Sequence, residues 1–166
     1  NNLGGTTNID YSKSTYLNNT FSSNISNIGF NLWVPIIISE INGMGGIHNL
    51  SYNLYYNYYG GYYDYPTKEF RGFNKVDELI LNISITKHWF NQSISLKGTE
   101  YKTEIFDVNS KPFQTKEFIW NTVQSGNYYI NQLSKEISYQ YDGLYISPRK
   151  IETQYSYDVY GNVISI

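Results

Sequence analysis

Turn sequences recur along this chain, and most of them lead into a segment of alternating polar and apolar residues. From Leu79 to Trp89 this alternation is typical of a strand that buries one face. Asp107–Pro112 predicts a hairpin turn, because it joins two further strand-like segments. One strand with its turn cannot bury a face alone, so such units must stack. The pattern therefore predicts an all-β fold, an antiparallel sheet made of consecutive hairpins.

The amino-acid composition agrees with this fold class. Tyrosine occurs 19 times and alanine not at all, and tyrosine favours strands as alanine favours helices. A length of 166 residues suits one domain with room for a real core. The net charge of −2 gives no reason to expect a nucleic-acid partner.

Metal, cofactor and membrane functions also lack support. There is no cysteine, which excludes thiolate metal sites, and no His/Asp cluster has metal-ligand spacing. The longest apolar run, Leu32–Ile38, is too short to span a bilayer. We therefore expect no cofactor, no metal and no membrane span.

Gly60–Val76 is the densest run of glycine, aromatic and charged residues, and the rest of the chain is organised around it. Gly60 and Gly61 permit positive φ, and Pro66 excludes a central strand at its position. Arg71–Phe73 is typical of a backbone turn. We expect one β region over 1–166, with a first repeat-like part at 1–59, an ordered connection at 60–76 and a second repeat-like part at 77–166.

Several motifs resemble those of the Rhs, or YD-repeat, family. Tyr157–Val163 is similar to its Tyr-Asp-x-x-Gly-Asn-φ repeat, where φ is apolar, and Phe106–Pro112 resembles a diverged copy with Ser110 in the place of glycine. Glu69–Val76 and Leu96–Tyr101 resemble the Glu-Phe-Arg-Gly-Phe-Gly-x-Val and Leu-Lys-Gly-x-x-Tyr motifs of Tc-toxin B-type and SpvB-like proteins.

The resemblance implies a non-catalytic structural segment of a larger β-sheet shell that encloses or presents a toxin or effector cargo. It also implies a secreted or cell-surface bacterial protein. Its partners would be neighbouring repeats of the same parent chain and other toxin-complex subunits. The chain starts on a turn without Met, so we expect a piece of something longer. The structural motif residues that the resemblance implies are Glu69, Phe70, Arg71, Gly72, Phe73, Tyr157, Asp158, Gly161 and Asn162.

Arg71 is the motif residue with the most definite expected role. A guanidinium group carries five N–H donors in a fixed planar arrangement. We expect it to donate to backbone carbonyls or a carboxylate beneath the aromatic rings of Phe70 and Phe73, and so to act as a structural anchor.

A binding module is the alternative function. Clustered tyrosines supply large contact area at low entropic cost, which suits cell-surface glycans or a protein partner. The competing interpretation, which we favour, is that these rings pack within the sheet. The candidate ligand surface comprises Tyr55, Tyr59, Tyr62 and Tyr63.

Enzymatic activity is not expected. The two histidines, His48 and His88, have no serine and acid arranged as a triad. His88 is expected on a sheet surface or paired across strands. The carboxylates around the central stretch could form a glycosidase pair, but pairing with nearby Lys68, Arg71 or Lys75 is the simpler interpretation.

Overall fold

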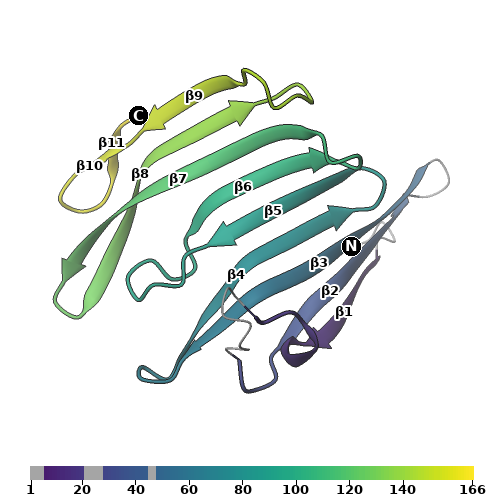
Figure 1. Ribbon diagram of the computed structural model, residues 1–166, viewed down its shortest axis with the longest axis horizontal. Helices are drawn as coiled ribbons and strands as arrows, with labels where there is room; N and C mark the ends of the chain where they lie inside the picture. The colour runs from purple at the N-terminus through teal and green to yellow at the C-terminus, as the bar shows by residue number, and fades with distance from the viewer. Residues whose placement is uncertain (1–5, 21–27, 45–47) are drawn as a thin grey trace.

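The computed structural model describes residues 6–20, 28–44 and 48–166, and these form two antiparallel sheets and one short 3-10 helix (Figure 1). In the larger sheet nine strands lie in chain order, each paired with the next. A separate two-stranded sheet follows. The elements are β1 (Thr6–Lys13), η1 (Ser14–Tyr16), β2 (Trp33–Met44), β3 (His48–Asp64), β4 (Glu69–Ile80), β5 (Ser84–Phe90), β6 (Glu100–Asp107), β7 (Pro112–Ser125), β8 (Tyr128–Gln140), β9 (Arg149–Gln154), β10 (Ser156–Tyr157) and β11 (Val163–Ser165).

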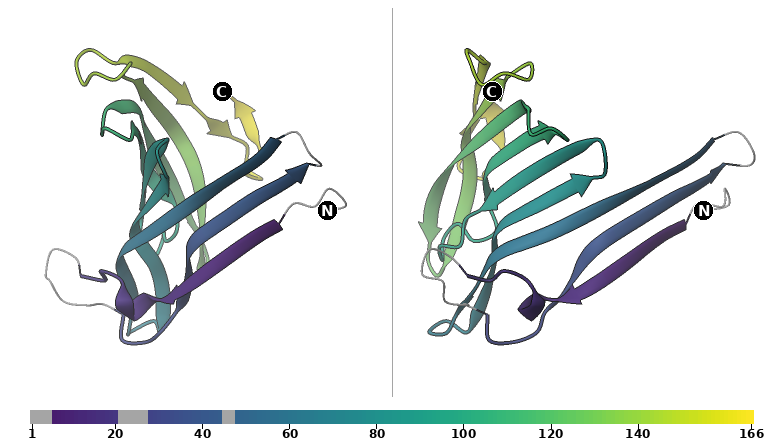
Figure 2. Two further views of the ribbon diagram at one scale, coloured as in Figure 1. Left: turned by 90° about the vertical axis from the view of Figure 1, so that its right-hand side faces the viewer. Right: turned by 45° about the vertical axis from the view of Figure 1, so that its right-hand side comes forward.

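The large sheet is a single curved layer, and few hydrophobic side chains among the described residues are buried. Figure 2 shows the sheet twisting and bending without a second sheet stacked against it. Among the described residues the buried hydrophobic side chains are Ile28, Val34, Phe106 and Ile137. The chain is long enough for a real core, but its consecutive hairpins extend one layer instead of folding back as a second one.

Lysine and aromatic side chains stabilise one face of this layer across four strands. The cross-strand register places Tyr59 opposite Lys75, Lys75 opposite Trp89, and Trp89 opposite Lys102. The Lys75 ammonium group lies 4.7 Å from the Tyr59 ring centroid and 5.7 Å from that of Trp89, and the Lys102 ammonium group lies 5.0 Å from the latter. Such contacts let the lysine stems cover the rings while their charged ends remain hydrated.

The expected strand from 76 to 89 is interrupted by a hairpin turn at 81–83. Asn82 has φ 59°, and the amide of Ile83 donates to the carbonyl of Ile80 at 3.0 Å. This is the pattern of a three-residue hairpin loop with a left-handed residue, a conformation that asparagine tolerates. Leu81 and Ile83 are therefore exposed at the turn, although their alternation matched a buried face.

Gly60–Val76 is part of a hairpin within one sheet, where a connection between two sheet regions was expected. It contains the end of β3, the turn at 65–68 with Pro66, and most of β4. Arg71–Phe73 was expected to form a turn but lies within β4, where Gly72 has φ 85°. The ladder shifts register between Gly61 and Tyr63, so the glycines accommodate a bulge instead of a turn. The division into parts at 1–59 and 77–166 stays a prediction.

Residues 14–20 and 28–32 form a flap that packs on β3. The amide of Gly60 donates to the carbonyl of Asn18 at 3.1 Å. Ser14 is fully buried, and its hydroxyl accepts the amide of Leu32 at 2.9 Å. A Cβ at Gly61 would collide with Ile28, which shows how closely the flap approaches the strand.

Candidate functional site

Arg71 lies at the centre of the Glu69–Phe73 motif and is almost buried. Its Nη2 donates to a carboxylate oxygen of Asp64, and the two side chains are each 11% exposed. Nη1 donates to the carbonyl of Gln92 at 3.4 Å, and Nη2 also lies 3.4 Å from the hydroxyl of Thr67. The contacts to a carboxylate and a carbonyl agree with the expected geometry, and the anchoring role stays a prediction.

The surroundings of Arg71 differ in part from the expectation. Its guanidinium lies 5.9 Å from the ring centroid of Tyr62, while Phe70 and Phe73 pack edge-on against each other at 5.6 Å. Glu69 pairs with Lys97 on the β5–β6 loop and lies 3.9 Å from Arg71 Nε. The motif therefore ties the β3–β4 hairpin to the next loop.

Gln92 is an anchoring residue that the sequence analysis missed. Its Nε2 donates to the carbonyls of Gly60 at 2.7 Å and Gly72 at 2.9 Å. Both glycines have positive φ, so the amide satisfies carbonyls at the two irregular points of this hairpin. A lone glutamine in a loop gives no sequence signal for this contact, because its two partners are 32 and 20 residues away.

The Tyr157–Asn162 motif forms a turn centred on Asp158. One carboxylate oxygen accepts the amides of Tyr160 at 2.9 Å and Asn162 at 2.8 Å, and the other accepts Nδ2 of Asn162 at 2.9 Å. These hydrogen bonds, those from Asn162 foremost, lower the pKa of Asp158. Gly161 has φ 87°, and the hydroxyl of Tyr157 donates to the carbonyl of Leu133 at 2.8 Å. The tyrosine thereby attaches the small β10–β11 sheet to β8.

The diverged copy at Phe106–Pro112 has the same turn geometry. An oxygen of Asp107 accepts the amides of Asn109 at 2.8 Å and Lys111 at 2.7 Å, as in the Asp158 turn. Ser110 occupies the position of Gly161 and has φ 61°. The aspartate therefore specifies the turn even where the glycine is absent.

Replacing Ser110 by glycine is expected to stabilise the chain. A left-handed conformation costs a non-glycine residue about 1–2 kcal/mol, and glycine loses about 0.5–1 kcal/mol through backbone entropy. Ser110→Gly should therefore raise the free energy of unfolding by about 0.5–1 kcal/mol in urea titrations. Gly161→Ser at the matching position should lower it, and a loss of stability in Ser110→Gly would contradict the strain argument.

The four tyrosines of the candidate ligand surface are partly buried, and each packs against another side chain. None of them forms an open platform in the part of the chain that the structure describes. This packing supports the interpretation that we favoured, and ligand binding by these rings stays a prediction. The contacts are Tyr55 hydroxyl with Asn53 at 3.4 Å, Tyr59 ring with Lys75 at 4.7 Å, Tyr62 ring with Arg71 at 5.9 Å, and Tyr63 ring with Phe30 at 4.9 Å.

His88 pairs with Glu100 across β5 and β6. Its Nδ1 lies 2.6 Å from an oxygen of Glu100, which also accepts the hydroxyl of Thr103 at 2.5 Å. The hydrogen bond to Glu100 raises the pKa of His88 despite the opposing effect of burial. Burial acts to raise the pKa of Glu100, but the hydrogen bonds from His88 and Thr103 outweigh it and lower that pKa.

These shifts predict a pH-dependent stability. The raised His88 pKa gives stability that is complete below its ordinary value of 6.5 and is lost as pH rises through the folded-state value. The lowered Glu100 pKa gives stability that is lost as pH falls below its ordinary value of 4.5. Between pH 4.5 and 6.5 the free energy of unfolding of the wild type should therefore be about 1 kcal/mol higher than that of His88→Gln. This difference should vanish at alkaline pH.

Thermal unfolding across the pH range measures this effect. Glu100→Gln should remove the same pH-dependent difference, because either substitution breaks the pair. Parallel pH profiles for wild type and His88→Gln would contradict the assignment.

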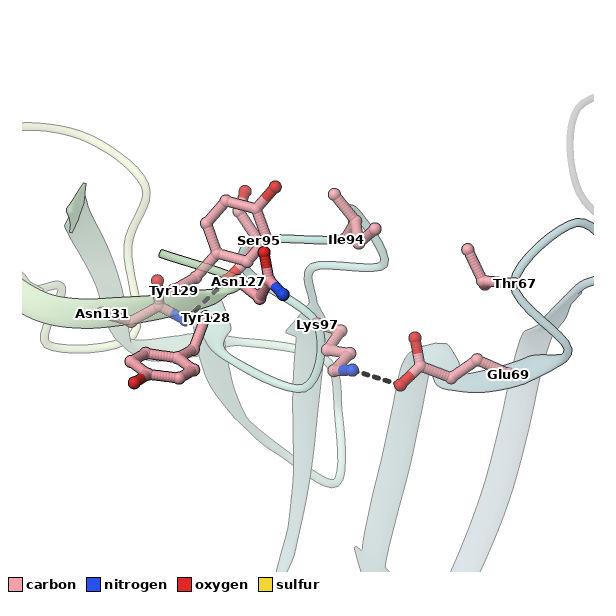
Figure 3. A pocket seen from close by; sticks show the side chains of 9 residues that line it. All are labelled: Thr67, Glu69, Ile94, Ser95, Lys97, Asn127, Tyr128, Tyr129 and Asn131. Carbon is pink, nitrogen blue, oxygen red and sulfur yellow. Dashed lines mark hydrogen bonds and ion pairs between the residues drawn. The ribbon is translucent and has the colours of Figure 1, made fainter. Parts of the chain in front are cut away.

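Three hairpin tips surround a pocket of about 430 Å³ that the sequence analysis did not predict (Figure 3). The tips belong to the β3–β4 turn, the β5–β6 loop and the β7–β8 turn, which are far apart in sequence. Among its residues, Glu69 and Lys97 lie in motifs that were identified from the sequence. The lining residues are Thr67, Glu69, Ile94, Ser95, Lys97, Asn127, Tyr128, Tyr129 and Asn131.

The described residues contain neither a metal-binding cluster nor a membrane-spanning helix. Ranges 6–20, 28–44 and 48–166 contain no group of three His, Asp or Glu side chains placed to hold a metal ion. The same part of the chain contains no helix long and apolar enough to cross a membrane.

Solved structures contain the same fold. The chain matches TcdB2-TccC3 without its hypervariable C-terminal region at 15% identity and a TM-score of 0.76, over 98% of this chain and 11% of that one. It matches a Photorhabdus luminescens Tc holotoxin pore with a TccC3 mutation at 14% identity and a TM-score of 0.75, over 96% of this chain and 11% of that one. The chain thus spans about a ninth of these structures. No curated protein matched it.

The sheet of consecutive hairpins with its aspartate-centred turns defines an antiparallel all-β protein with the fold found in these structures. The sequence signature of the family described as "Insecticide toxin TcdB middle/N-terminal region" matches residues 1–93, which is more than half of the chain. The chain belongs to this family. The resemblance to Tc-toxin B-type proteins and the all-β fold of consecutive hairpins are both confirmed.

Proposed function

We propose that this chain is a non-catalytic wall segment of a secreted Tc-toxin B component, which encloses a toxic cargo within a β-sheet shell. The observation that carries the proposal is the single-layered sheet of hairpins in chain order. A layer without a packed core is suited to forming a wall, because strands can be added at either edge. Membership of the TcdB family supports the toxin context.

The edge strands supply the contacts of such a wall. Within the described residues β1 pairs only with β2, and β9 only with β8, so each has one free edge. Free edges present unpaired N–H and C=O groups that favour pairing with further strands. The partners proposed for these edges are neighbouring strands of the same parent chain, and other Tc-toxin subunits would contact the assembled shell.

The native parent polypeptide tests this function. An antibody raised to the 19.3 kDa chain should detect a far larger native band, and the purified parent should form hollow particles in negative-stain electron microscopy. Cargo inside the shell should resist a protease that digests it after denaturation. A native band close to 19.3 kDa would overturn the proposal.

A further inference from the structure

The pocket lies between the tips of three hairpins, the β3–β4 turn, the β5–β6 loop and the β7–β8 turn. These hairpins lie one after another in the same sheet. Figure 3 shows Tyr128, Tyr129 and Asn127 on one side and Thr67 and Glu69 on the other, with Lys97 between them. Its volume of about 430 Å³ lies within the range of small-ligand sites.

Side-chain hydrogen bonds hold the three tips in place. Lys97 pairs with Glu69 across the first two tips, and Asn131 Nδ2 donates to the carbonyl of Ser95 at 2.7 Å across the second and third. The loop between β5 and β6 is closed by the amide of Asn91, which donates to the carbonyl of Thr99 at 2.9 Å. These contacts hold the three tips relative to one another before a ligand arrives, which lowers the entropic cost of binding.

The lining chemistry favours a neutral ligand with many hydroxyl groups. Glu69 and Lys97 neutralise each other, so the pocket has no excess charge for an anion or a cation. Within the described residues the side chains of Asn127, Tyr128 and Tyr129 make no hydrogen bond, and these amide and phenol groups can both donate and accept. The tyrosine rings offer apolar faces beside these polar groups.

We propose that this pocket binds one unit of a neutral saccharide. The C–H face of a sugar ring would pack on the ring of Tyr129, while its hydroxyl groups would hydrogen-bond to the amide of Asn127 and the carboxylate of Glu69. The binding surface differs from the partly buried tyrosines of β3, and it does not depend on the shell function.

Saturation-transfer NMR on the 166-residue chain tests this assignment, with lactose, maltose, chitobiose and mannobiose as probes. At least one disaccharide should give a saturable signal. Tyr129→Ala should weaken its binding about tenfold, because it removes an aromatic contact. Tyr129→Phe should retain most of the affinity, and Asn127→Ala should reduce it.

Tyr160→Ala is the matched control, since Tyr160 is an exposed tyrosine outside the pocket, and it should leave binding unchanged. Circular dichroism of each variant separates lost binding from lost folding. The proposal is overturned if none of the four disaccharides saturates, or if binding is equal in wild type, Tyr129→Ala and Asn127→Ala. These outcomes are independent of the parent's size, so they do not affect the shell proposal.

Discussion

Arg71→Ala is expected to lower the free energy of unfolding by about 3–5 kcal/mol, because it leaves the Asp64 carboxylate without its cationic partner. Both side chains of this pair are 11% exposed, so water cannot replace the guanidinium fully. The substitution also removes the hydrogen bond to the Gln92 carbonyl. Urea denaturation followed by tryptophan fluorescence measures the loss.

Three variants separate this effect from a general loss of packing. Arg71→Lys should recover only part of the stability, because an ammonium group cannot reach Asp64 and Gln92 with the same planar geometry. Asp64→Asn combined with Arg71→Ala should be less destabilising than the sum of the single changes, because the two groups interact. Lys97→Ala removes a more exposed ion pair and should cost less than about 1 kcal/mol. An unchanged melting temperature in Arg71→Ala would show that this residue is no structural anchor.

Gly61→Ala is expected to detach the flap from β3 and to lower the free energy of unfolding by about 2–3 kcal/mol. Losses of this size are typical when a side chain is added to a site that is already closely packed. The new Cβ would collide with the Ile28 side chain and lie 2.9 Å from Asn19 Oδ1. Ile28 is 4% exposed and cannot move without giving up its packing. Faster proteolysis within residues 28–32, together with a lower urea midpoint, would report this release.

The clash can be tested separately from backbone strain. Ile28→Ala creates space, so Gly61→Ala should cost much less in that background than in wild type. Gly126→Ala is the comparison for strain alone, because Gly126 has φ 60° and no atom lies within 4 Å of the position that its new Cβ would occupy. Equal effects of Gly61→Ala in the presence and absence of the Ile28 side chain would contradict the steric explanation.

Local turn chemistry was the part of this molecule most readable from its sequence. The aspartates at Asp107 and Asp158 each bind two amides of their own turn, so the information lies within five residues. The β1–β2 ladder likewise shifts register beside Pro35, a residue that cannot donate a ladder hydrogen bond.

Period-two alternation was less reliable, as residues 79–89 illustrate. Leu81 and Ile83 are apolar residues that fit the alternating pattern, but they lie in the turn at 81–83 and are exposed. The alternation therefore did not reveal the turn. A turn was predicted at Arg71–Phe73 within Gly60–Val76, but these residues lie in a strand. Glycine permits positive φ equally at a turn and at a bulge, and its neighbours in sequence do not distinguish the two.

The sequence by itself determined the all-β class, the aspartate turns and the family, since each depends on residue types within short segments. The tertiary structure decided that the hairpins form one layer, in which few of the described hydrophobic side chains are buried. It also brought Gln92 to the carbonyls of Gly60 and Gly72, and three distant tips around one pocket. These features depend on how the sheet twists and bends, because that curvature sets which residues far apart in the chain come into contact.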